Sequence, residues 1–188
     1  MEASLDRIGP NAVRQTVQAL RERGHPGVLA RSGVAVPSPK SGLIPEADFE
    51  RLVDQLREEL TPSEAETVLA RAGVLTGRYV SQHRIPAPFR SLLRWLPRRW
   101  GLYLLLVAFQ RHAWTFTGRG RFDWRWGPTP AIRLVDVPTC RSCGSGRGGS
   151  FYRAAFTQLL ALAAPGVRVE ETMCQRRGDA CCEFEIHA

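Results

Sequence analysis

The residues of this chain best suited to chemistry are its five cysteines, which all lie between residues 140 and 182. Cys140 and Cys143 form a CxxC motif, and Cys174 and Cys182 flank a predicted tight turn. Thiols clustered in this way are typical of a thiolate metal site, with Zn–S distances of ~2.3 Å. We expect Cys140, Cys143, Cys174 and Cys182 to bind one structural Zn²⁺ tetrahedrally. The alternatives are small core thiols or a disulfide.

Strand alternation indicates which of the two adjacent cysteines, Cys181 or Cys182, is the expected zinc ligand. In the predicted strand 181–187, Cys182 shares one face with Phe184 and Ile186, and Cys181 shares the other with Glu183, Glu185 and His187. Successive side chains of a strand point to opposite faces. Cys182 therefore belongs to the apolar face, and we expect its strand to pair with 167–173 so that Cys174 comes close.

Helices are predicted to fill the first part of the chain. Thr61, Pro62 and Glu64 form a capping box that opens a helix running to about residue 83. Asn11 is expected to cap a helix over 11–23. Two further helical stretches are 46–60 and 89–114, the second interrupted near Pro97. The segment 25–44 reads as a loop with a short strand at 34–36.

The second part of the chain changes to strand patterns. Strands are expected over 115–126 and 131–137, followed by a helix over 150–164 and the cysteine-bearing pair of strands. This order predicts an α+β fold, with N-terminal helices packed on an antiparallel sheet. We expect a single ligand-binding domain over 1–188, with a helical part (1–114) and a part holding the sheet and zinc site (115–188).

Charge and hydropathy narrow the class of partner. The net charge is +8, and Lys40 is the only lysine among 26 basic residues. The arginines either cover solvated faces or favour anionic partners. We expect no nucleic acid partner, because the arginines are spread along the chain without a binding motif. The polar N-terminus and the short apolar run 101–109 predict a cytoplasmic protein without a signal peptide or spanning helix.

The last third of the chain carries a recognisable set of residues. They are Trp126-Gly127, a glycine-rich segment before a helix, Glu170-Glu171-Thr-Met-Cys174, and Cys174, Gly178, Cys182 and Phe184 in the pattern C-x-x-x-G-x-x-x-C-x-F. This part resembles the 4-vinyl reductase domain family, and the helices before it fit the same domain. The resemblance implies the α/β ligand-binding fold shared with NO-sensing haem domains and vesicle-transport subunits. It also implies zinc binding by Cys174 and Cys182, as in related aromatic-sensing regulators.

The resemblance further implies a role in bacteriochlorophyll biosynthesis and photosynthesis. The associated compound is a Mg-tetrapyrrole such as protochlorophyllide, and the associated activity is reduction of its 8-vinyl group. A reductase needs a hydride source, yet no G-x-G-x-x-G follows a strand, and 144–149 reads as a connector. We therefore expect a tetrapyrrole-binding carrier or accessory of the pathway's enzymes. The alternative is a divinyl protochlorophyllide 8-vinyl reductase that uses an external reductant. Homodimer formation stays open.

A helical face and its arginines provide the candidate ligand site. We expect Leu105, Phe109 and His112 to face the pigment, with Arg111 or Arg98 near its carboxylate. His112 or His83 could ligate the central magnesium. The competing interpretations are core aromatics, a hydrogen-bonded histidine and solvated arginines. The segment 89–100 mixes aromatics with arginines and could lie on an anionic membrane surface; the alternative is an ordinary packed helix.

Overall fold

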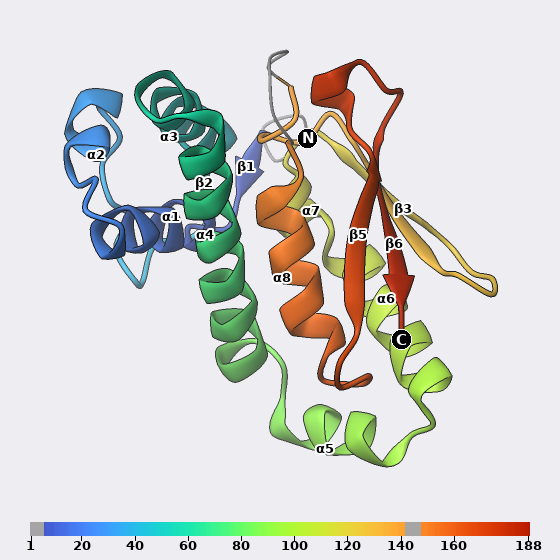
Figure 1. Ribbon diagram of the computed structural model, residues 1–188. Helices are drawn as coiled ribbons and strands as arrows, with labels where there is room; N and C mark the ends of the chain where they lie inside the picture. Colours follow the sequence, from blue (N-terminus) through green and yellow to red (C-terminus); the bar gives the residue numbers. More distant parts are fainter. Residues whose placement is uncertain (1–5, 142–147) are drawn as a thin grey trace.

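The fold is α+β, as expected, with one group of helices beside a four-stranded antiparallel sheet (Figure 1). The computed structural model describes residues 6–141 and 148–188. Its helices are α1 (Asn11–Glu22), α2 (Gly27–Ser32), α3 (Glu46–Glu59), α4 (Pro62–His83), α5 (Ala87–Trp95), α6 (Arg98–His112), α7 (Trp114–Thr117), α8 (Ser150–Leu160) and the 3₁₀ turn η1 (Gln175–Arg177). Its strands are β1 (Arg7–Ile8), β2 (Ile44–Pro45), β3 (Arg121–Arg125), β4 (Ala131–Val135), β5 (Arg168–Met173) and β6 (Cys182–His187).

The large sheet has the strand order β3-β4-β6-β5, with all neighbours antiparallel. Its inner face is apolar, and Phe156 of α8 packs against the middle of that face. The Phe156 ring lies 6.4 Å from that of Phe122 on β3 and 5.9 Å from that of Phe184 on β6. Phe109 of α6 also meets Phe156, at 5.7 Å between ring centroids. Helices α6 and α8 therefore cover the same face of the sheet.

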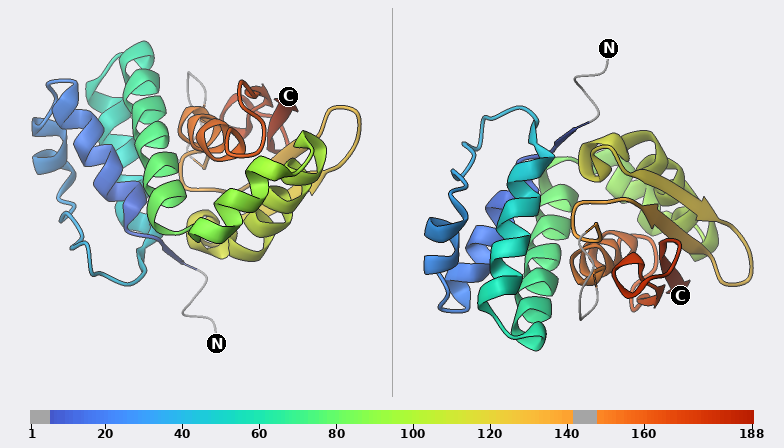
Figure 2. Two further views of the ribbon diagram at one scale, coloured as in Figure 1. Left: turned by 90° about the horizontal axis from the view of Figure 1, so that it is seen from below. Right: turned by 90° about the horizontal axis from the view of Figure 1, so that it is seen from above.

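Helix α4 joins the N-terminal helices to the sheet half by packing closely on α8 (Figure 2). Two glycines one turn apart, Gly73 and Gly77, make this contact. A Cβ built on Gly77 would lie 2.9 Å from the carbonyl oxygen of Ala155, and one on Gly73 would lie 2.9 Å from Cβ of Ala154. The absence of side chains at these two positions lets the helix backbones approach.

Local signals explain most helix boundaries, with two corrections. The Thr61 hydroxyl accepts from the Glu64 amide, and the Glu64 carboxylate accepts from the Thr61 amide, so the capping box is confirmed. Asn11 does not cap α1; Pro10 occupies that position with helical backbone angles and no capping side chain. The expected loop 25–44 contains α2, which begins after Pro26 and ends at Gly33 with φ 64°. No strand forms at 34–36; the short strand is β2.

The expected strand 115–126 is also partly wrong. Its first residues continue from α6 into the short helix α7, and extended pairing begins only at Arg121. Gly118 (φ 61°) makes the turn between them, and a Cβ there would collide with the buried Glu46 carboxylate. The Tyr152 hydroxyl donates to the Phe116 carbonyl at 3.0 Å and holds α7 against α8.

Candidate functional site

Three of the four predicted zinc cysteines meet beneath the sheet. The Cys140 and Cys182 sulfurs lie 2.9 Å apart, too far for a disulfide bond of ~2.05 Å. The Cys174 sulfur accepts from the Gly148 amide at 3.1 Å, and the Cys182 sulfur accepts from the Gln175 amide at 3.4 Å. All three thiols are buried and reduced. Cys143 lies outside the described residues.

A fourth donor of this cluster is a carboxylate that the sequence analysis did not assign. The carboxylate of Glu171, which is buried, lies with the Cys174 and Cys182 sulfurs in a group whose ligand atoms are all within 4.8 Å of one another. Tetrahedral ligands at ~2.3 Å from a metal are roughly 3.8 Å apart, so this spread fits one ion. A signal was present in the sequence, because alternation places Glu171 on the inner face with Val169.

Short backbone features bring the donors together. The chain reverses between Cys174 and Cys182 through η1 and Gly178, whose φ of 97° suits glycine. The Asp179 carboxylate accepts from the Cys174 amide at 2.7 Å and closes this turn. Gly149 donates to Glu171 at 2.9 Å, and a Cβ at Gly149 would lie 2.5 Å from that carboxylate oxygen.

An ion-pair network fixes the segment that ends at Cys140. The Arg141 guanidinium, which is largely buried, donates to the Glu46 carboxylate at 2.8 Å and also binds Glu50 on α3. It reaches Asp136 at 3.1 Å as well. Two of these three carboxylates, Glu46 and Glu50, belong to α3, so the Arg141 side chain links the segment before α8 to the N-terminal helices. The position of the Cys140 thiol therefore depends on contacts with α3 as well as on the sheet.

Hydrogen bonding and burial keep two thiols of the cluster, Cys174 and Cys182, protonated when no metal is bound. A hydrogen bond with Cys182, then burial, raises the pKa of Cys174 to about 12. A hydrogen bond with Cys140 raises the pKa of Cys182 above its ordinary range. The Cys174 and Cys182 thiols thus resist ionisation by themselves, whereas a divalent metal deprotonates coordinating thiols outright.

Arg57 of α3 lies beside this cluster and donates to the Thr139 carbonyl at 2.9 Å. Burial, and then the neighbouring Arg176, lower the pKa of Arg57 to about 10, while the charges of Cys140 and Cys174 oppose that shift. A metal bound by thiolates and a carboxylate would carry net negative charge, which this guanidinium would balance.

The predicted pigment residues occupy two different environments. Leu105 is fully buried and Phe109 is 8% exposed, both in the core between α6, α8 and the sheet. His112 and Arg111 are exposed at the last turn of α6, and Arg98 is exposed at its first residue. His83 lies outside this region, at the end of α4, where its ring stacks on Tyr79 at 4.5 Å.

Aromatic side chains border α6 along β3 and the turn that follows it. The Tyr103 ring packs edge-on against those of Trp124 and Trp126, at 5.5 and 5.4 Å. The guanidinium of Arg99 lies over the Trp126 ring, 5.4 Å from its centroid. The side of α6 next to β3 is therefore a surface of flat rings with a cation beside it.

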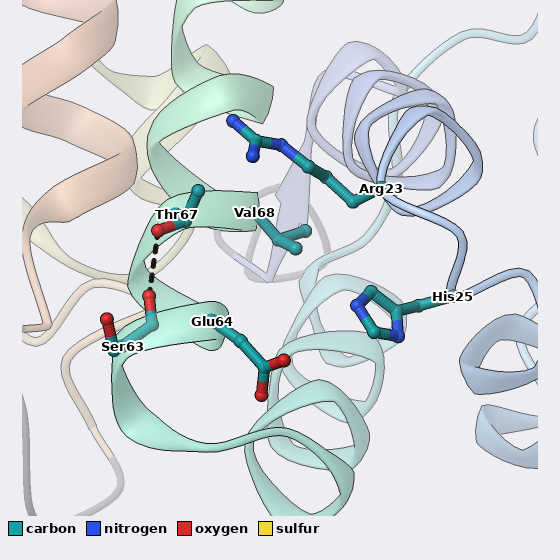
Figure 3. A pocket seen from close by; sticks show the side chains of 6 residues that line it. All are labelled: Arg23, His25, Ser63, Glu64, Thr67 and Val68. Carbon is teal, nitrogen blue, oxygen red and sulfur yellow. Dashed lines mark hydrogen bonds between the residues drawn. The ribbon is translucent and has the colours of Figure 1, made fainter.

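A hollow of about 270 Å³ lies away from these aromatic rings, between the end of α1 and the start of α4 (Figure 3). It is lined mainly by polar side chains: Arg23, His25, Ser63, Glu64, Thr67 and Val68. Sites for drug-sized ligands are usually larger and mostly apolar. We therefore do not assign a tetrapyrrole to this hollow.

Comparison with known proteins identifies the family. The chain is 35% identical over 195 residues to the bacteriochlorophyll synthase 23 kDa chain of Cereibacter sphaeroides, covering 96% of this chain and 90% of that protein. The protein of the same name from Rhodobacter capsulatus is 36% identical over 187 residues, covering 96% and 87%. The chain belongs to the bacteriochlorophyll synthase 23 kDa chain family. The resemblance to the 4-vinyl reductase family is thereby confirmed, although no family model matches the chain.

Solved structures support the fold of this family member. An H-NOX protein from S. oneidensis in its Fe(II)NO state aligns with a TM-score of 0.54 at 14% identity, covering 96% of this chain and 98% of that one. A structure from work on haem redox potential and porphyrin distortion gives 0.52 at 12% identity, covering 94% and 97%. At these identities the likeness shows the fold alone, and it agrees with the fold that the sequence resemblance implied.

Proposed function

We propose that this protein binds a Mg-tetrapyrrole intermediate of bacteriochlorophyll biosynthesis and acts as a carrier or accessory protein for the enzymes of that pathway. The observation that carries the proposal is the family relationship, at 35–36% identity over nearly the whole chain, to proteins named as a chain of bacteriochlorophyll synthase. The haem and porphyrin named for one structural neighbour support a tetrapyrrole as the ligand of this fold.

The proposed binding region is the side of α6 that faces β3 and α8. A macrocycle there would contact Leu105 and Phe109, and its carboxylate would pair with Arg98 or Arg111. His112 would supply a ring nitrogen to the central magnesium. Because Leu105 and Phe109 are buried against α8 and the sheet, binding requires α6 to move away from the Phe156 ring.

The thiol cluster is proposed as a structural zinc site. Cys140, Cys174 and Cys182 would bind the ion, with Glu171 or Cys143 as the fourth ligand. Such an ion would tie β6 and the 174–182 turn to the segment before α8. Four protein ligands leave no open coordination position, so its role would be stabilising rather than catalytic.

One titration separates the carrier from the alternative, an 8-vinyl reductase with an external reductant. Divinyl protochlorophyllide is added to the purified protein, first alone and then with NADPH, while its absorption spectrum is recorded. We expect a saturable, stoichiometric spectral shift and unchanged pigment on extraction. Monovinyl product formed without another protein would overturn the carrier role, and no spectral shift at any ratio would overturn pigment binding.

A further inference from the structure

The corner between α5 and α6 exposes large apolar side chains to an unusual degree. Trp95, the last residue of α5, is 88% exposed, and Trp100, in the first turn of α6, is 65% exposed. Leu92 of α5 is 46% exposed. Tryptophan is normally well buried on average, so two such residues beside one two-residue turn need an explanation. Gathered apolar groups on a surface commonly mark an interaction site.

This exposure belongs to a firmly held corner rather than to a loose one. Leu93 of α5 is 1% exposed and anchors the helix in the core. Arg90 donates to the carbonyls of Ser81 and Gln82, at 2.7 and 3.0 Å, and joins α5 to the end of α4. A Cβ on Gly101 would lie 2.8 Å from that of Ala163, so α6 starts in close contact with the chain after α8.

The stretch of sequence that contains this corner carries charge of a single sign. Residues 67–122 contain ten arginines and no aspartate or glutamate. Arg94, Arg98 and Arg99 at the corner are all exposed. The tip of the nearby β3–β4 turn adds Trp126, which is 37% exposed and lies under Arg99. An anionic surface could approach this part of the chain without meeting any carboxylate from those 56 residues.

We propose that the α5–α6 corner is a peripheral membrane-binding surface that docks on a bilayer containing anionic lipid. Trp95, Trp100 and Leu92 would enter the headgroup region, where the amphipathic indole ring is favoured. Arg94 and Arg98 would bind lipid phosphates. Figure 1 places α5 at the opposite end of the molecule from α2 and α3, and the left view of Figure 2, seen from below, turns this end toward the viewer.

The side chains exposed on α5 and at the start of α6 fit contact along the bilayer surface. Within residues 6–141 and 148–188, no helix is both long and apolar enough to cross a membrane. Short helices with apolar and cationic side chains bind in the plane of the interface. A protein partner would require matching acidic groups for the arginines and pockets for the indoles. An anionic bilayer supplies negative headgroups for the arginines and an interfacial layer into which the indole rings can insert, so we favour a bilayer over a protein partner.

Vesicle flotation of the full chain tests this surface without any pigment, so the result is independent of the proposed function. Vesicles of phosphatidylcholine with phosphatidylglycerol are compared with phosphatidylcholine alone, at low and high salt. We expect binding to the anionic vesicles that weakens with salt. A double variant, Trp95→Ala with Trp100→Ala, should lose about tenfold in partitioning. Arg94→Gln with Arg98→Gln should lose roughly 25-fold, since each arginine near the membrane surface contributes about a fivefold factor.

Matched controls locate the contact on the protein. Trp114→Ala removes a tryptophan that is 53% exposed at the first residue of α7, beyond the far end of α6 and roughly 20 Å from the corner. Arg21→Gln with Arg23→Gln removes the same charge from the last turn of α1 and the residue that follows it. Both controls should retain vesicle binding. Absence of vesicle binding, or equal losses in the controls and the corner variants, would overturn the proposal; the first outcome would favour a protein partner instead.

Discussion

The Cys140 and Cys182 sulfurs lie 2.9 Å apart although 42 residues separate them in the chain. This contact joins the start of β6 to the segment that leads into α8. It is also the centre of a cluster in which Cys174 and Glu171 take part. Cys181, the immediate neighbour, is half-buried on the other face of the strand.

The first prediction concerns metal content. Cys182→Ser should lose bound zinc and lower the thermal midpoint, because it removes a central donor of the cluster. Cys181→Ser should keep the bound zinc and the thermal midpoint. Glu171→Gln should lower the affinity for zinc if the carboxylate is the fourth ligand. Metal analysis of protein purified without chelator or affinity tag measures this. Zinc well below half an equivalent in the wild type, or loss in Cys181→Ser alone, would contradict the assignment.

The second prediction concerns the pigment. His112→Ala should change the absorption of bound protochlorophyllide and weaken binding about tenfold, because it removes the proposed magnesium ligand. His83→Ala is the control, since the His83 ring stacks on Tyr79 away from α6. Spectral titration of both variants gives the affinities. An unchanged spectrum and affinity in His112→Ala would exclude the axial role while leaving the rest of the surface standing.

The third prediction concerns the contact between α4 and α8. Gly73→Ala should destabilise the protein by about 1–2 kcal/mol, because steric overlap with the Phe151 carbonyl outweighs the better helix propensity of alanine. Gly42→Ala adds the same methyl group where nothing lies within 4 Å and should change stability by less than ~0.5 kcal/mol. Urea unfolding curves compare them. Equal stability of the two variants would show that α4 and α8 can shift apart enough to accept the added methyl group without loss of stability.

The fourth prediction concerns pH. The Arg71 side chain, at 2.6 Å, lowers the pKa of Glu22 and links α1 to α4. A lowered folded-state pKa stabilises the protein above the unfolded value of ~4.3, and this contribution is lost as pH falls through the folded value. Glu22→Gln should therefore cost a few tenths of a kcal/mol at neutral pH, as for exposed pairs, and nothing in stronger acid. Unfolding curves at both pH values test this. A pH-independent difference would assign the effect to something other than the ion pair.

The alternation of apolar side chains was enough to place Cys182 correctly. Cys182, Phe184 and Ile186 are all buried, as their shared strand face predicts. The capping box at Thr61 was equally local and equally predictable. Val34 and Val36 show the limit of such patterns: they alternate with Ala35 as in a strand, yet Val36 is 45% exposed and no strand of residues 6–141 or 148–188 pairs with them. Strand formation depends on a partner that the local sequence does not specify.

The environment of Glu171 could not be read from its own segment. Its burial depends on the amide of Gly149, which comes from the segment before α8, and on cysteines from two other elements. The pairing of β5 with β6 also shifts between Glu171 and Met173. Similarly, Leu105 and Phe109 share the helical face that was expected, but the sequence does not show that α8 covers it.

That cover has a kinetic consequence. Because Phe109 packs on Phe156 and Leu105 is fully enclosed, a pigment that contacts them can enter only while α6 is displaced. At low pigment concentration the observed binding rate would rise in proportion to concentration, and at high concentration it would level off at the rate of helix opening. Substitution of Phe156 by a smaller side chain would raise that plateau. The ring between the two helices would then set how quickly pigment is loaded, separately from how tightly it is held.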